Sequence, residues 1–162
     1  MATIEKALQI AAKAHEGQRD KDGQPYILHP LRVLNGVDGD EAKIVAALHD
    51  VVEDSTVTEA DLRNEGFSEA VITAVNCLTH RKGESYADYV IRCGENDIAR
   101  RVKLADLEDN FRPSRAILRP DRLEPDFTRL RRYLLSYKFL TGKLTEAQYR
   151  EAMGEQPRAV EP

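Results

Sequence analysis

The stretch Ala46-Ala47-Leu48-His49-Asp50-Val51-Val52-Glu53-Asp54 predicts a central helix with two different faces. The apolar residues of this helix and of the turn before it share one arc: Ile44, Val45, Leu48, Val51 and Val52. The polar residues share the opposite arc: His49, Asp50, Glu53 and Asp54. An imidazole beside a carboxylate suits a divalent metal ion. Two further carboxylates one turn away suit proton transfer with a water molecule.

Taken alone, this helix also fits a second interpretation. Acidic residues on a helix face are usually only solvated, and a His-Asp pair is unremarkable in a chain with four histidines. The metal interpretation gains from three other positions, His29, Asp106 and Asn110. Two imidazoles and two carboxylates would form a shell that suits Mn²⁺, Fe²⁺, Co²⁺ or Zn²⁺ better than Mg²⁺.

The composition describes an ordinary globular protein. With 162 residues, 41% of them hydrophobic, the chain is expected to form one domain at 1–154, followed by a polar tail at 155–162. It has no apolar run that could cross a bilayer and no signal-peptide pattern, and its two cysteines are spaced as free thiols, so a cytoplasmic protein is expected.

The charge pattern separates possible ligands. A net charge of -4 argues against general nucleic-acid binding. Residues 100–143 are nevertheless rich in Lys and Arg, while the rest of the chain is acidic. Most of these cations are expected on solvated helix faces, but a basic half facing an acidic metal site would suit a polyphosphate substrate. The sequence makes no prediction of a protein partner or an oligomeric state.

Local signals predict an all-α helical bundle, because no period-2 alternation is long enough for a strand. Thr3 is expected to cap a first helix that ends at Gly17, with His15 as a core residue of that helix. Later helices are expected after several further residues: Pro30, Asp38 or Asp40, Thr58 with Asp61, and Ser68. Further helices are expected over 86–92, over 97–110 and around Phe127 to Tyr137.

Four runs, in this order, carry a resemblance to a known family: Ala14-His15-Glu16-Gly17-Gln18, Pro25-Tyr26-Ile27-Leu28-His29-Pro30, Leu48-His49-Asp50-Val51-Val52-Glu53-Asp54 and Val102-Lys103-Leu104-Ala105-Asp106. Together they resemble the HD-domain hydrolases of the RelA/SpoT type, and most of all the small stand-alone alarmone hydrolases. The resemblance runs from about Ile4 to Asn110. Because no synthetase domain follows, it implies hydrolysis without synthesis.

The resemblance implies a role for each matched residue. The metal, usually Mn²⁺, would be held by four ligands: His29, His49, Asp50 and Asp106. The water would be positioned and activated by Glu53 and Asp54. Asn110 would complete the catalytic set, and Lys103 would lie beside the phosphates. The implied reaction, a step of the stringent response, removes the 3′-diphosphate of (p)ppGpp and gives pyrophosphate with GDP or GTP.

One loop departs from the family pattern. An Arg-Lys pair usually lies near the base and ribose; here Lys21 is present, but Asp20 stands at the arginine position and Arg19 lies one residue early. Aspartate offers only acceptors, whereas arginine offers a planar fork of donors. We therefore expect weaker guanine recognition, with Lys21 near the ribose. The alternative is that Arg19 or an arginine of the basic segment after Asn110 reaches the base.

Two other functions remain open from the sequence. The same chemistry could act on another phosphorylated nucleotide, such as an adenine alarmone or NADPH. A non-catalytic regulator that binds a metal or a nucleotide is the alternative from another class. The presence of Glu53, Asp54 and Asn110 argues against the regulator.

Overall fold

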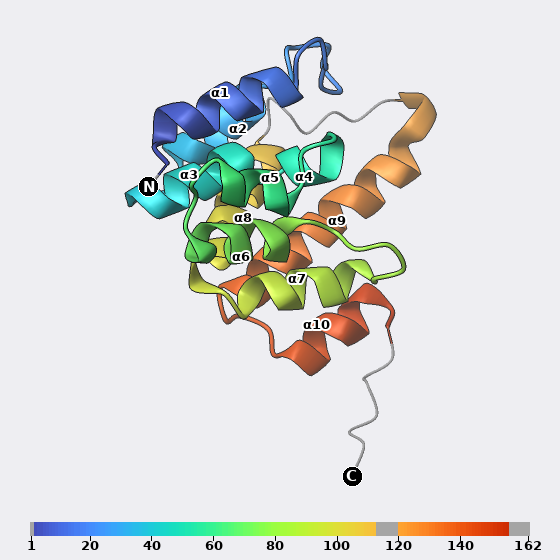
Figure 1. Ribbon diagram of the computed structural model, residues 1–162. Coiled ribbons are helices and arrows are strands. Elements are labelled where there is room, and N and C mark those ends of the chain that lie inside the picture. The colour runs from blue at the N-terminus through green and yellow to red at the C-terminus, as the bar shows by residue number, and fades with distance from the viewer. Residues whose placement is uncertain (1, 113–119, 156–162) are drawn as a thin grey trace.

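The computed structural model describes residues 2–112 and 120–155. Within them it contains helices and no strand, which confirms the all-α prediction. The helices are α1 (Ile4–Ala14), α2 (Leu28–Asn35), α3 (Asp40–Leu48), α4 (Val51–Asp54), α5 (Glu59–Asn64), α6 (Glu69–Leu78), α7 (Tyr86–Gly94), α8 (Asp97–Phe111), the short 3₁₀ helix η1 (Pro120–Arg122), α9 (Leu123–Leu140) and α10 (Glu146–Met153). Figure 1 shows α9 crossing the bundle beside α7 and α8.

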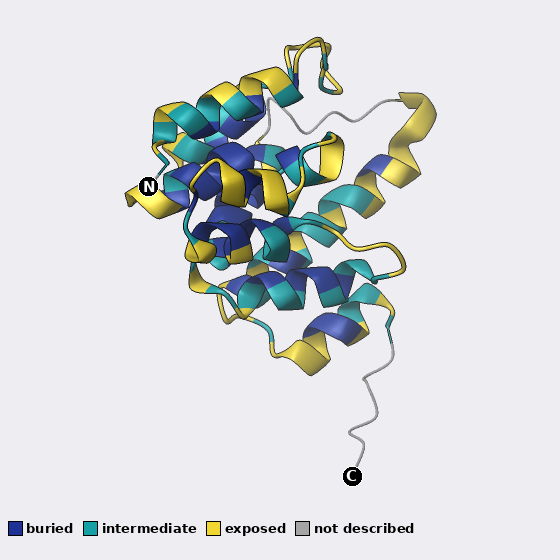
Figure 2. Cartoon of the chain, in the orientation of Figure 1, coloured by how far each residue is buried: buried dark blue, intermediate teal, exposed yellow. Residues whose placement is uncertain are grey.

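Helix α3 lies at the centre of the core. It packs against α1, α2, α6 and α8, and every residue from Ile44 to Leu48 is buried. Figure 2 shows the buried positions gathered around this helix and its neighbours. Ala46 and Ala47, on the same side of the helix as the polar residues, are also inside the core, because helices cover α3 on several sides.

The expected central helix is interrupted at His49 and Asp50, two of the predicted metal ligands. Helix α3 ends at Leu48 and α4 begins at Val51. Between them Asp50 has φ −100° and ψ −7°, which departs from the values of a regular α-helix. The prediction of one continuous helix is therefore wrong. It relied on the spacing of the hydrophobic residues, which continues unchanged through the break. His49, the last residue with regular helical dihedrals before the break, has a buried side chain.

The expected caps are mostly confirmed. Thr3 caps α1, Ser68 caps α6, and Thr58 with Asp61 forms the capping box of α5. Two boundaries differ. Helix α1 ends at Ala14 rather than at Gly17, and α3 has no side-chain cap, because Gly39 with φ +89° precedes it in place of Asp38 or Asp40. Glycine takes this left-handed backbone without steric cost.

Candidate functional site

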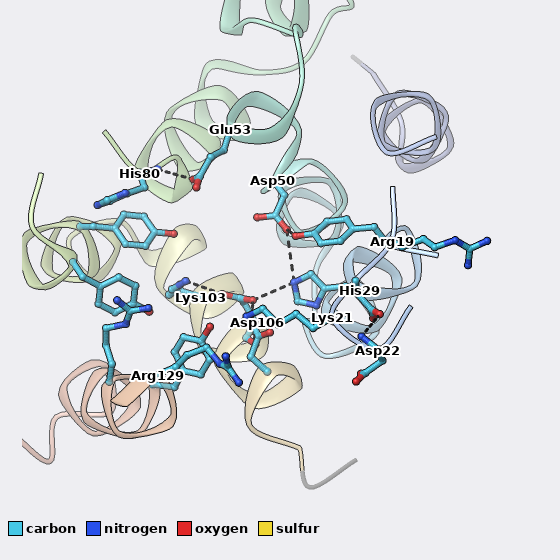
Figure 3. A pocket seen from close by; sticks show the side chains of 17 residues that line it. Arg19, Lys21, Asp22, His29, Asp50, Glu53, His80, Lys103, Asp106 and Arg129 are labelled. Atoms are coloured by element: carbon cyan, nitrogen blue, oxygen red, sulfur yellow. Dashed lines mark hydrogen bonds and ion pairs between the residues drawn. The ribbon is translucent and has the colours of Figure 1, made fainter. Parts of the chain in front are cut away.

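Four predicted ligands from three parts of the fold lie together: His29, His49, Asp50 and Asp106. His29 lies in the first turn of α2, His49 and Asp50 form the junction of α3 and α4, and Asp106 lies on α8. His29 Nε2 is 3.2 Å from Asp106 Oδ1 and 3.7 Å from Asp50 Oδ2, and His49 Nε2 is 3.0 Å from Asp50 Oδ2. Figure 3 shows both carboxylates turned toward the His29 ring. We call these four residues the ligand cluster.

The two imidazoles in this cluster are oriented as metal ligands. His49 Nδ1 lies 2.8 Å from the Ala46 carbonyl oxygen, which can only accept, so Nδ1 carries the proton and Nε2 presents a lone pair. That Nε2 is buried, and although Asp50 Oδ2 lies 3.0 Å away, it makes no hydrogen bond of good geometry among the residues that the structure describes. The donor atoms of His29, His49 and Asp50 all lie within 4.8 Å of one another. A buried acceptor beside two acidic groups fits a divalent cation.

Other residues, which the sequence did not single out, orient these ligands. Asp109 Oδ2 is 2.8 Å from His29 Nδ1, and Asp109 Oδ1 accepts from Arg32 Nε at 2.7 Å. The Tyr26 hydroxyl donates to Asp50 Oδ2 at 2.7 Å. Metal-binding histidines commonly donate their second ring N–H to a carboxylate in this way. The position of Asp109, one helical turn after Asp106, was the available sequence signal.

Burial and neighbouring charges shift the pKa of each group in the cluster. Burial raises the pKa of Asp50, but the interaction with the adjacent His49 ring outweighs burial and lowers this pKa to about 2. Burial also raises the pKa of Asp106, yet the Lys103 ammonium, 2.7 Å from Asp106 Oδ2, holds it well below its usual range. Burial lowers the pKa of His29, while hydrogen bonds with Asp106 and Asp109 raise it to about 9. Both aspartates are therefore ionised at neutral pH.

A cavity of about 400 Å³ opens beside the cluster and is within the usual size for a small-molecule site. Its wall combines the acidic and imidazole groups with five cationic side chains: Arg19, Lys21, Lys103, Arg129 and Arg132. Tyrosines from α7 and α9 complete this side of the wall. The cavity thus joins a candidate cation site to a surface that suits an anionic ligand.

The three predicted catalytic residues differ in position. Glu53 lines the cavity, and its Oε2 accepts from the His80 backbone N–H at 2.9 Å (Figure 3). Asn110 also lines the cavity and donates to Asp106 Oδ1 at 2.5 Å. Asp54 is not among the lining residues and accepts from Gln18 Nε2 at 3.3 Å. The structure therefore brings Glu53 and Asn110, but not Asp54, to the cavity wall.

The predicted substrate loop has a defined turn. Lys21 lines the cavity, and Asp20 Oδ1 accepts from the backbone N–H groups of Asp22 and Gln24, both at 2.9 Å. Arg19 donates to the Gly23 carbonyl at 2.7 Å, and in Figure 3 its guanidinium points away from the ligand cluster. Asp20 therefore stabilises the turn, as aspartates often do in loops.

Helix α9 contributes residues to the site that sequence patterns did not identify. Arg129, Arg132 and Tyr133 all line the cavity. Arg129 is held by Asp126, which is fully buried and lies 2.9 Å away. From sequence alone, arginines on a helix are expected to be solvated. Arg129 and Arg132 line the cavity because α9 packs against α7 and α8. Of the basic segment expected after Asn110, residues 113–119 lie outside the described residues.

The comparisons with known proteins agree with this site. The family model described as "HD domain" matches residues 7–105. A GTP pyrophosphokinase of Myxococcus xanthus is 35% identical over 127 residues, which cover 67% of this chain and 17% of that protein. A guanosine-3′,5′-bis(diphosphate) 3′-pyrophosphohydrolase of Haemophilus influenzae is 35% identical over 127 residues, covering 70% of this chain and 19% of the relative. The chain thus spans less than a fifth of these relatives.

A solved structure has the same fold. It is described as a metazoan ortholog of SpoT, and it superposes with a TM-score of 0.67 at 24% identity, over 95% of this chain and 93% of the other. Among the described residues, no helix is long and apolar enough to cross a membrane. The curated relatives confirm the resemblance to the RelA/SpoT type, and a divalent metal site is consistent with the HD-domain match and the ligand cluster. The match over residues 7–105 shows that the chain belongs to the HD domain family.

Proposed function

We propose that this chain hydrolyses the 3′-diphosphate of (p)ppGpp-type alarmones and releases pyrophosphate with GDP or GTP. The observation that carries the proposal is the ligand cluster at one side of a cavity whose other wall is cationic. Relatives named guanosine-3′,5′-bis(diphosphate) 3′-pyrophosphohydrolase support the substrate class. The proposal includes Mn²⁺ as the resident ion, a cytoplasmic location, residues 1–154 as the catalytic domain and 155–162 as a tail, of which 156–162 lie outside the described residues.

His29, His49, Asp50 and Asp106 would hold the ion, which when bound makes water easier to ionise and offsets phosphate charge. Glu53 is placed to take the proton, because it lines the cavity and the His80 N–H fixes its carboxylate. Lys103, buried against Asp106, offsets negative charge on the phosphate oxygens. Asn110 holds the Asp106 carboxylate.

Asp54 has a different role in this proposal. Its contact with Gln18 ties α4 to the segment after α1, so it acts as a positioning residue. Gln18 in turn lies 2.7 Å from His15 Nδ1, which agrees with the expectation that His15 is a hydrogen-bonded core residue outside the ligand set. Glu53 then carries the proton transfer alone.

The loop supports a relaxed choice of base as the second element of the proposal. Arg19 is engaged with the Gly23 carbonyl, and the Asp20 carboxylate accepts two backbone N–H groups. Arg19 lines the cavity with its Nη1 already engaged, and Asp20 carries no donor to replace the arginine expected near a guanine. We propose that Lys21 contacts the ribose-phosphate region and that adenine alarmones are accepted as an alternative substrate.

The experiment that tests the function uses the Mn²⁺-loaded protein with ppGpp, ppApp and NADPH. We expect pyrophosphate and GDP from ppGpp, and no pyrophosphate when His49→Ala replaces the wild type. Orthophosphate from NADPH without pyrophosphate from either alarmone would establish the alternative phosphohydrolase. Tight binding of ppGpp with no product from any of the three nucleotides would establish a regulator.

A further inference from the structure

Arg132 and Tyr86 form an unusual pair in the cavity wall. The guanidinium carbon of Arg132 lies 4.2 Å from the centroid of the Tyr86 ring, and both residues line the cavity. Arg132 Nε and the Tyr86 hydroxyl are buried, yet neither has a hydrogen-bond partner within 2–112 and 120–155. A buried polar group without a partner costs free energy, so two such groups side by side indicate a ligand that completes them.

The Arg132–Tyr86 pair is connected to Lys103, and so to the ligand cluster, through the ring of Tyr89. Lys103 Nζ is 2.7 Å from Asp106 Oδ2 and 5.0 Å from the centroid of the Tyr89 ring. The Tyr89 and Tyr86 rings are in edge contact, with centroids 5.8 Å apart. A phosphate that lies against the ligand cluster and Lys103 therefore has the Tyr86–Arg132 pair as a further cationic group on the wall that α7 and α9 provide, where Arg129 also lines the cavity.

The substrate loop approaches the cluster from a different side. Figure 3 shows Arg19, Lys21 and Asp22 beside His29, whereas Glu53 and His80 lie across the cavity from them. If Lys21 contacts the ribose-phosphate region, the nucleoside lies on the loop side. The phosphate chain then extends through the cluster toward the side that α7 and α9 provide.

We propose that Arg132 and Tyr86 form the subsite for the terminal phosphate of the 3′-diphosphate and so select a diphosphate over a monophosphate. This inference rests on the proposed function. Stacking on Tyr86 fixes the plane of the guanidinium, and a fixed fork of donors matches two phosphate oxygens. The Tyr86 hydroxyl supplies a third donor to the same group. Lys103 serves the phosphate that water attacks, whose bond to the ribose 3′-oxygen breaks, and Arg132 serves the terminal phosphate, which departs still joined to the first as pyrophosphate.

Product inhibition tests this assignment with matched variants. Arg132→Gln removes the cation, Arg132→Lys keeps the charge without the fork, and Tyr86→Phe removes only the hydroxyl. Arg131→Gln is the control, because Arg131 is exposed on the same helix and donates to the Ala152 carbonyl at 2.6 Å. The measurements are the inhibition constants of inorganic pyrophosphate and orthophosphate, and the dissociation constant of pyrophosphate by calorimetry with Mn²⁺ present.

We expect Arg132→Gln to weaken pyrophosphate binding by about 10–100-fold, the range for hydrogen bonds to charged groups, while orthophosphate inhibition stays unchanged. Arg132→Lys should recover part of the loss, Tyr86→Phe should lose less, and Arg131→Gln should match the wild type. Equal losses for both anions, or no loss in Arg132→Gln, would overturn the assignment. A wild type that binds pyrophosphate but releases none from ppGpp would instead refute the proposed function, because the calorimetric comparison needs no turnover.

Discussion

Replacing Asp109 by asparagine tests whether the ligand cluster depends on its supporting carboxylate. Asp109 is 3% exposed and accepts from two donors, His29 Nδ1 at 2.8 Å and Arg32 Nε at 2.7 Å. Asparagine has the same shape but turns an NH₂ group toward one of these donors, so one hydrogen bond is lost and His29 is no longer held in one tautomer. Loss of such a supporting partner typically weakens metal binding about 10–100-fold, or about 1.4–2.7 kcal/mol.

Calorimetric titration of the metal-free protein with Mn²⁺ measures this effect directly. Glu108→Gln is the matched control, because Glu108 is the neighbouring acidic residue on α8 and is exposed. Circular dichroism establishes that both variants keep their helices. An Asp109→Asn protein that is folded and binds Mn²⁺ as tightly as the control would contradict the role we assign to this carboxylate.

Three further outcomes are expected. Glu53→Gln should keep the bound metal and lose about 10²–10⁴-fold in turnover, the range for a general acid or base, and near-normal turnover would remove Glu53 from the mechanism. Asp20→Ala should raise KM for ppGpp and ppApp alike, because the turn loses two hydrogen bonds; a changed ratio of kcat/KM between the two would show that Asp20 contacts the base. In the metal-free protein, burial lowers the pKa of His29, but its hydrogen bonds with Asp106 and Asp109 raise it to about 9 from an ordinary 6.5. Protonation of His29 therefore stabilises the folded state by about 3 kcal/mol. This contribution is fully present below pH 6.5 and is lost as the pH rises through 9. Denaturant unfolding in EDTA at a series of pH values will measure it. Mn²⁺ affinity should change in the opposite direction and increase with pH, because binding displaces the proton.

Local chemistry explains the parts of the fold that the sequence predicted well. A cap such as Thr3 or Ser68 acts within three residues of itself, so its signal does not depend on the rest of the molecule. The four proposed ligands were predicted for a different reason, namely their match to the motifs of a family, and the structure brings them together. The break at His49 and Asp50 was missed because the apolar spacing passes through it unchanged.

Long-range packing decides the features that sequence reasoning did not reach. Arg129 and Arg132 line the cavity only because α9 crosses α7 and α8. Asp109 reads as a solvated acid until α2 brings His29 and Arg32 to it. In both cases the partner is far away in the sequence, and no local pattern indicates which distant segment will pack there.

The origin of the ligands in three separate segments has a mechanical consequence. His29 belongs to α2, His49 and Asp50 to the junction after α3, and Asp106 to α8, so an ion bound by all of them acts as a cross-link between distant parts of the chain. The unfolded chain disperses these side chains, and the free energy of binding therefore adds to the free energy of unfolding by mass action. Under the proposed function, the thermal stability of the protein would report the supply of its ion, and scarcity of that ion would lower stability and turnover together.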